Sequence, residues 1–140
     1  MEVQIYLHYN GKCAEALEFY KHALGAKIET IMRFKDAPPD PKNPVKPELA
    51  NQVMHSTFRI GNATLMASDC GAPMQGFSIS VGFDSTEEVE RAFRALSKGG
   101  KVTQELSETF FAHSFGMCDD PYGVNWMLIH AKQMPMQQSA

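Results

Sequence analysis

The sequence predicts an α+β protein in which one strand–helix–strand–strand–strand module (βαβββ) occurs twice. Two short segments alternate apolar and polar residues, each leads into a helix with an apolar face, and each helix is followed by glycine. A repeat too short to bury its own sheet needs a second copy to pack against. A constant offset of 74 residues relates the matching positions: Ile5 and Ile79, Leu7 and Val81, Phe19 and Phe93, Gly25 and Gly99, and Ile28 and Val102.

The first module is interrupted by a long insertion. Residues 36–50 contain five of the eight prolines of the chain, and no regular element is expected to survive there. The strand pair after the insertion is expected to turn at Gly61 and Asn62, a hairpin signal. The expected elements of this module are strand 3–9, helix 14–24, strand 27–35, and strands 51–60 and 63–68.

The second module repeats this order without the insertion. Ser85 and Glu88 have the spacing of a capping box at the start of a helix, and Gly99 follows its end. In the strand after the insertion, His55 aligns with His113. The expected elements are strand 77–83, a helix from residue 86 to about residue 98, strands 101–107, 112–118 and 124–130, and a tight turn at 120–123.

The boundaries follow from this pattern. We expect one domain over residues 1–131, with module one at 1–70, module two at 76–131, and a tail at 132–140.

Composition excludes several classes of protein. The formal net charge is −3, which argues against a dedicated nucleic-acid binder. No apolar run approaches the roughly 20 residues of a membrane span, and residues 1–9 lack the features of a signal peptide. The three cysteines have no CxxC spacing, so neither a disulfide framework nor a thiolate zinc site is expected. These features predict a soluble cytoplasmic protein.

Three segments carry a family resemblance: residues 11–26, residues 108–116 and residues 120–127. With them the chain resembles the vicinal oxygen chelate superfamily of glyoxalases, extradiol dioxygenases and bleomycin- and fosfomycin-resistance proteins. Within it the chain is similar to the PhnB-like, or 3-demethylubiquinone methyltransferase-like, branch. The resemblance implies a glyoxalase-like fold, in which two βαβββ modules form a curved, cup-shaped mixed sheet, commonly within a homodimer. A methyl-donor nucleotide is not expected, because no glycine-rich strand-to-helix turn is present.

The resemblance also implies positions for a divalent metal, on the first and fourth strands of each module. Strand alternation maps these positions to Gln4, Met66, Ser78 and Met127. Thioethers bind Zn²⁺, Mn²⁺ or Fe²⁺ poorly, so we expect no metal and no cofactor there. A rival hypothesis places a metal between His8, His55 and His113, although no two of them have metal-motif spacing.

The mapped lining of the cup mixes hydrogen-bonding and soft apolar groups, which suits a small organic ligand. Arg59 is either a carboxylate- or phosphate-binding group or a solvated rim residue. If the protein catalyses a reaction, His55 and His113 are the candidate bases. The predicted ligand-binding residues are Gln4, Tyr6, His8, His55, Thr57, Arg59, Met66, Ser78, Ser80, His113, Phe115 and Met127.

Other candidate residues have structural interpretations. Cys13 lies near a helix start but is expected to be a buried thiol. Phe110, Phe111 and Trp126 are expected in the core. The insertion at 36–50 is either a lid, a dimer edge or a disordered segment.

The leading functional hypothesis is a PhnB-like homodimer that binds a small organic molecule without a metal. The alternatives are a metal-dependent lyase or dioxygenase that uses the cup histidines, and a protein that sequesters a drug without turnover. Exposed sheet edges and apolar cup walls favour the dimer. Whether the protein is an enzyme is left open.

Overall fold

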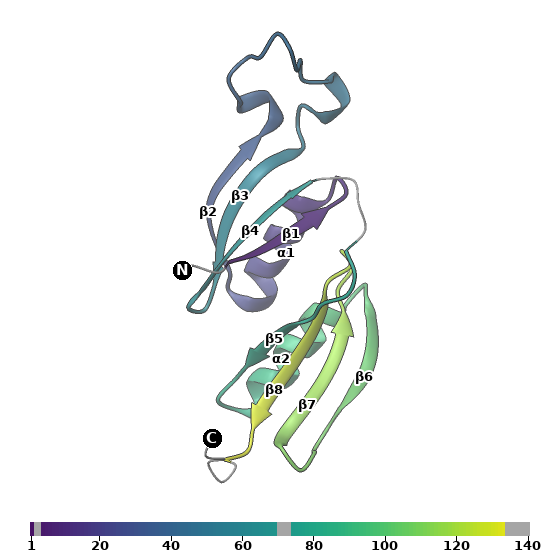
Figure 1. The fold of residues 1–140 in the computed structure, drawn as a ribbon. Coiled ribbons are helices and arrows are strands. Elements are labelled where there is room, and N and C mark those ends of the chain that lie inside the picture. Colours follow the sequence, from purple (N-terminus) through teal and green to yellow (C-terminus); the bar gives the residue numbers. More distant parts are fainter. Residues whose placement is uncertain (2–3, 70–73, 134–140) are drawn as a thin grey trace. The chain divides into compact units, whose positions relative to one another are not determined.

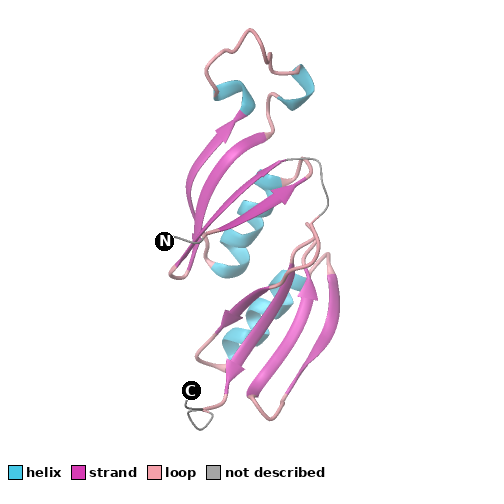
Figure 2. Ribbon diagram, in the orientation of Figure 1, coloured by secondary structure: helices cyan, strands magenta, loops and turns pink. Residues whose placement is uncertain are grey.

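The computed structural model describes residues 1, 4–69 and 74–133. It divides into two compact units, Met1–Met74 and Gln75–Ala140, at the segment that separates the two predicted modules. Each unit is a four-stranded mixed sheet with one helix against one face (Figures 1 and 2). The predicted α+β class and the two modules are confirmed. Among the described residues, no helix has the length and apolar character needed to cross a membrane.

Unit 1 has the strand order β1-β4-β3-β2. Strand β1 pairs parallel to β4, and the other two pairs are antiparallel. One short 3₁₀ helix, Phe34–Asp36, leads into the predicted insertion, and a second, Pro47–Leu49, lies near its end, where no regular element was expected. Backbone hydrogen bonds from the Phe34 N–H to Gln52 and from the Lys35 N–H to Ala50 hold the base of the insertion together. The elements are β1 Ile5–Tyr9, α1 Cys13–Leu24, β2 Lys27–Arg33, 3₁₀ helices Phe34–Asp36 and Pro47–Leu49, β3 Val53–Ile60 and β4 Ala63–Asp69.

Unit 2 has the corresponding order β5-β8-β7-β6, again with one parallel pair, β5 with β8. The identical topology confirms the repeat that the sequence predicted. The elements are β5 Ile79–Gly82, α2 Thr86–Ser97, β6 Lys101–Ser107, β7 Ala112–Asp119 and β8 Asn125–Ala131.

Local chemistry sets the helix ends. Gly25 follows α1 in the left-handed conformation (φ 69°), which glycine adopts without steric cost, and its N–H donates to the carbonyl of Lys21. The hydroxyl of Ser85 accepts the N–H of Glu88 and so caps α2 as the sequence predicted.

The core of unit 1 lies between α1 and the sheet. Leu7, Leu17 and Phe58 are buried there, and the ring of Tyr20 stacks on Phe58 with ring centres 6.2 Å apart. The hydroxyls of Tyr9 and Tyr20 lie 2.7 Å apart, so each buried phenol has a polar partner.

The core of unit 2 lies between α2 and its sheet and centres on Trp126. The Trp126 Nε1 donates to the buried carboxylate of Asp120 at 2.9 Å. The same carboxylate accepts the backbone N–H groups of Tyr122 and Val124, which forms the predicted tight turn. Gly116 allows close packing on this face, since a β-carbon there would lie 2.7 Å from Leu106 Cδ2 and 3.0 Å from Phe93 Cε2.

Two core predictions were wrong. Strand alternation places Ile5 with Leu7 and Tyr9 against the helix, but Ile5 is 47% exposed, because it is the first residue of β1 and β1 is an edge strand. Phe110 is 80% exposed, because it lies in the connection between β6 and β7, where its ring touches Phe111 edge-on. The predictions for Cys70 and for the tail beyond residue 133 fall outside the described residues.

Candidate ligand-binding faces of the two sheets

The face of the unit 1 sheet opposite α1 carries most of the predicted binding residues. Alternation along the strands buries Leu7, Phe58 and Leu65 toward α1 and turns their neighbours to the other face. The register then places Tyr6 beside Met66, and Met66 opposite Thr57. Three strands thus present a continuous row of one aromatic, one thioether and one hydroxyl side chain.

Tyr6 is the centre of a cluster on this face. Its hydroxyl lies 3.2 Å from His55 Nδ1, and its ring stacks on His8 with ring centres 5.0 Å apart and a 29° tilt. The Tyr6 and His55 ring centres are 5.8 Å apart. The structure therefore brings together three predicted residues from two strands, with a phenol oriented by an imidazole.

Arg59 lies on the same face, near the end of β3. Its Nε is 3.8 Å from a carboxylate oxygen of Glu29, and both side chains are nearly half exposed. An exposed ion pair at this distance contributes little to stability, so Glu29 is readily replaced by another anion. Gln4 is also exposed and directly precedes β1.

The corresponding face of unit 2 is less polar. Ser80 lies beside Met127, and Met127 lies opposite Met117. The Ser78 hydroxyl is engaged by Asn125 Oδ1. Phe115 is 8% exposed and packs edge-on against Phe111, so the structure places this predicted binding residue largely within the fold.

The register also changes the predicted alignment of the two modules. Tyr6 beside Met66 matches Ser80 beside Met127, and Thr57 opposite Met66 matches Met117 opposite Met127. His55 lies two residues before Thr57, and Phe115 lies two residues before Met117, so Phe115 is the counterpart of His55. The sequence had aligned His55 with His113 instead, and that alignment was wrong.

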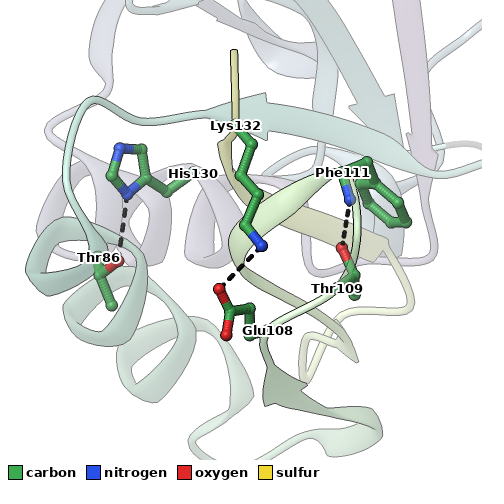
Figure 3. Close-up of polar contacts among 6 residues, drawn as sticks. All are labelled: Thr86, Glu108, Thr109, Phe111, His130 and Lys132. Carbon is green, nitrogen blue, oxygen red and sulfur yellow. Dashed lines mark hydrogen bonds and ion pairs between the residues drawn. The ribbon is translucent and has the colours of Figure 1, made fainter. Parts of the chain in front are cut away.

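His113 instead belongs to a cluster that the sequence did not predict. A register shift in β7 places Ala112 opposite Ala131 and Ser114 opposite His130, so strict alternation does not hold at His113. The His113 and His130 ring centres are 4.7 Å apart. Figure 3 shows His130 turned toward Thr86 at the start of α2, with Nδ1 3.1 Å from the hydroxyl.

An ion pair lies next to these histidines. Lys132 Nζ is 2.8 Å from the carboxylate of Glu108, and Figure 3 shows this contact beside the bond from the Phe111 N–H to the Thr109 hydroxyl. The hydrogen bond and the charge of Lys132 lower the pKa of Glu108, with a smaller contribution from His113. Glu108 is therefore a carboxylate at neutral pH.

Residues 1–129 match the family model described as 3-demethylubiquinone-9 3-methyltransferase. The chain belongs to this family. It is 31% identical to protein YjdN of Escherichia coli (strain K12), over 98% of this chain and 100% of that protein.

Solved structures agree with this family assignment. Protein PA1353 from Pseudomonas aeruginosa is 36% identical, with a TM-score of 0.80 over 94% of this chain and 100% of the other. The PhnB protein from Bacillus cereus, described as a putative 3-demethylubiquinone-9 3-methyltransferase, is 27% identical with a TM-score of 0.76 over the same shares. A glyoxylase/bleomycin resistance protein/dioxygenase domain from Frankia sp. EAN1pec shares the fold, with a TM-score of 0.63 at 11% identity, over 94% of this chain and 98% of the domain. The predicted PhnB-like resemblance and glyoxalase-like fold are confirmed.

The family description raises the question of a methyl-donor nucleotide, and the helix starts of this chain do not fit one. Such cofactors bind at a glycine-rich turn whose helix N–H groups are free. Here the Cys13 N–H at the start of α1 donates to the buried Asp69 carboxylate at 3.0 Å, and Ser85 caps α2. At each helix start, one of the N–H groups is thus already bonded to a side chain of the chain itself.

The metal positions implied by the superfamily fold do not fit a divalent ion either. Met66 and Met127 offer thioethers, and the Ser78 hydroxyl is engaged by Asn125. Over residues 4–69 and 74–133, no three His, Cys, Asp or Glu side chains are grouped so that they could hold a metal ion.

The two described thiols are not suited to nucleophilic chemistry. Both are fully buried, and burial raises the pKa of Cys13 to about 12 and that of Cys118 to about 11. The predicted structural role of Cys13 agrees with this, because a nucleophilic thiol needs a lowered pKa.

Proposed function

We propose that this family member binds a small planar organic molecule on the sheet face that carries Tyr6, and that binding needs no metal at the superfamily positions. The observation that carries the proposal is the cluster of Tyr6, His8 and His55. Stacked rings provide an apolar surface, and the phenol–imidazole pair provides a polar group of fixed orientation. Arg59 on the same face, whose ion pair with Glu29 is exposed and spans 3.8 Å, favours ligands that carry a carboxylate or phosphate.

The test is calorimetric titration of the full chain with planar aromatic compounds, each with and without a carboxylate. Tyr6→Phe keeps the ring and removes the hydroxyl, and it is expected to weaken binding about threefold to tenfold, since one hydrogen bond contributes about 1 kcal/mol. Tyr122→Phe makes the same chemical change in the turn before β8 and is expected to leave affinity unchanged. Absence of binding by the whole panel, or equal losses in both variants, would contradict the proposal.

The same mixtures distinguish the alternatives. Tight one-to-one binding with an unchanged ligand supports sequestration, whereas a new product identifies an enzyme. The Tyr6–His55 pair favours proton transfer as the chemistry of such an enzyme, because an imidazole is a suitable general base. His55→Gln would then abolish turnover while Tyr122→Phe would not.

We also propose that the chain works as a homodimer. Edge strands β2 and β6 carry exposed Ile31, Met32 and Val102, and Phe110 is exposed between β6 and β7. Exposed edges with apolar side chains are usually covered by a partner. Light scattering at micromolar concentration is expected to give twice the chain mass of 15.6 kDa. A mass equal to that of one chain would exclude the dimer.

A further inference from the structure

We propose that His113 and His130 together form a binding site for a divalent transition-metal ion of the Zn²⁺, Ni²⁺ or Cu²⁺ type. The sequence predicted no metal at the superfamily positions, and this site lies elsewhere, between β7, β8 and the start of α2. It does not depend on the proposed ligand-binding function, whose cluster belongs to unit 1.

The distance between the two rings matches a shared ion. A zinc-bound imidazole nitrogen lies about 2 Å from the metal, and its ring centre about 1 Å further away. For angles between 90° and tetrahedral at the ion, two such ring centres are about 4.2–4.9 Å apart. The His113 and His130 ring centres are 4.7 Å apart with a 40° tilt, which lies within this range.

Thr86 prepares His130 for coordination. The Thr86 hydroxyl lies 3.1 Å from His130 Nδ1. When Nδ1 donates its proton to this hydroxyl, the neutral ring carries its lone pair on Nε2, where it can bind a metal ion. Partners of this kind fix the tautomer and orientation of metal-binding histidines. The register shift in β7 supplies the other ligand, because His113 is the extra residue between Ala112, opposite Ala131, and Ser114, opposite His130.

The charges around the site favour a cation. The partial positive charge at the N-terminus of α2 repels a cation. The negative charges of Glu87 and Glu88, in the first turn of the same helix, offset that repulsion. Glu108 is close enough for His113 to influence its pKa, although Lys132 neutralises much of its charge. No third ligand from His, Cys, Asp or Glu completes the group within the described ranges, so water or a small anion would fill the open positions.

The experiment is calorimetric titration of untagged, EDTA-treated full-length protein with Zn²⁺ and Cu²⁺ in a non-chelating buffer. We expect one ion per chain, with Cu²⁺ bound more tightly than Zn²⁺. His113→Gln and His130→Gln are each expected to abolish this binding. Thr86→Val should weaken it about tenfold, the usual effect of removing an outer hydrogen-bond partner.

Matched controls are His22→Gln, on the exposed last turn of α1, and His55→Gln, on the other sheet. Both should bind as the unaltered chain does. Thermal unfolding of the metal-free variants checks folding, and His113 is exposed, so its variant tests the proposal even if His130→Gln fails to fold. Three outcomes would overturn the proposal. They are an unaltered chain that binds no metal ion, metal binding that survives His113→Gln, and metal binding that is abolished by His55→Gln rather than by His113→Gln.

Discussion

Gly100→Ala is expected to destabilise the protein by about 3 kcal/mol, at the upper end of the usual range for overpacking. Gly100 lies just before β6, and a β-carbon there would overlap the backbone carbonyl oxygen of Asp119 and lie 2.9 Å from the carbonyl carbon of Asp120. Because both neighbours are backbone atoms, neither can move aside by changing rotamer. Urea unfolding is expected to show a clearly lower midpoint with an unchanged slope.

Gly82→Ala is the matched control for this substitution. Gly82 also belongs to unit 2, at the end of β5, but a β-carbon there would meet no atom within 4 Å and its φ is not positive. A change within about 0.5 kcal/mol is therefore expected. Equal effects of the two substitutions would show that steric overlap with the backbone is not the cause.

Asp120→Ala is expected to cost at least about 3 kcal/mol, because hydrogen bonds to charged groups contribute about 1.5–3 kcal/mol each. The buried Asp120 carboxylate accepts three N–H groups, from Trp126 Nε1, Tyr122 and Val124, at 2.8–3.1 Å. Alanine would leave the Trp126 donor unsatisfied in the core. Tryptophan fluorescence can follow unfolding directly, because Trp126 is the single tryptophan of the sequence.

The neighbouring Asp119 provides the comparison for Asp120. Its Oδ1 accepts a hydrogen bond from Asn125 Nδ2 at 2.8 Å, but its side chain is only partly buried. We expect Asp119→Ala to cost about 1 kcal/mol. If Asp119→Ala and Asp120→Ala were equally destabilising, the three-donor explanation would fail.

The fold was largely predictable because strand and helix periodicities are strong signals and the chain repeats them. The same offset that relates Leu7 to Val81 also relates Gly25 to Gly99, so each module supports the interpretation of the other. Alternation further gave the correct face for Tyr6, His55 and Met66, since their neighbours are buried against α1.

The part of the site that the sequence could not show arises from local departures from regular geometry. A register shift in β7 has no composition signal, so His113 was expected to align with His55 and its contact with His130 was missed. His130 itself has the same strand parity as the buried Trp126 and Leu128, a pattern that suggests only a core-facing position. The exposure of Phe110 was also missed, because two adjacent aromatic residues beside a strand, here Phe110 and Phe111, are usually buried.

The parallel pairing of β1 with β4, and of β5 with β8, has a consequence for how such a chain could arise. The first and last strands of each unit are hydrogen-bonded neighbours, so each unit forms its own four-stranded sheet without borrowing a strand from the other. A gene segment encoding this unit can therefore be copied in tandem and joined by a short linker. Each copy would then be free to accumulate its own changes, such as the proline-rich insertion in one half and the histidine pair in the other.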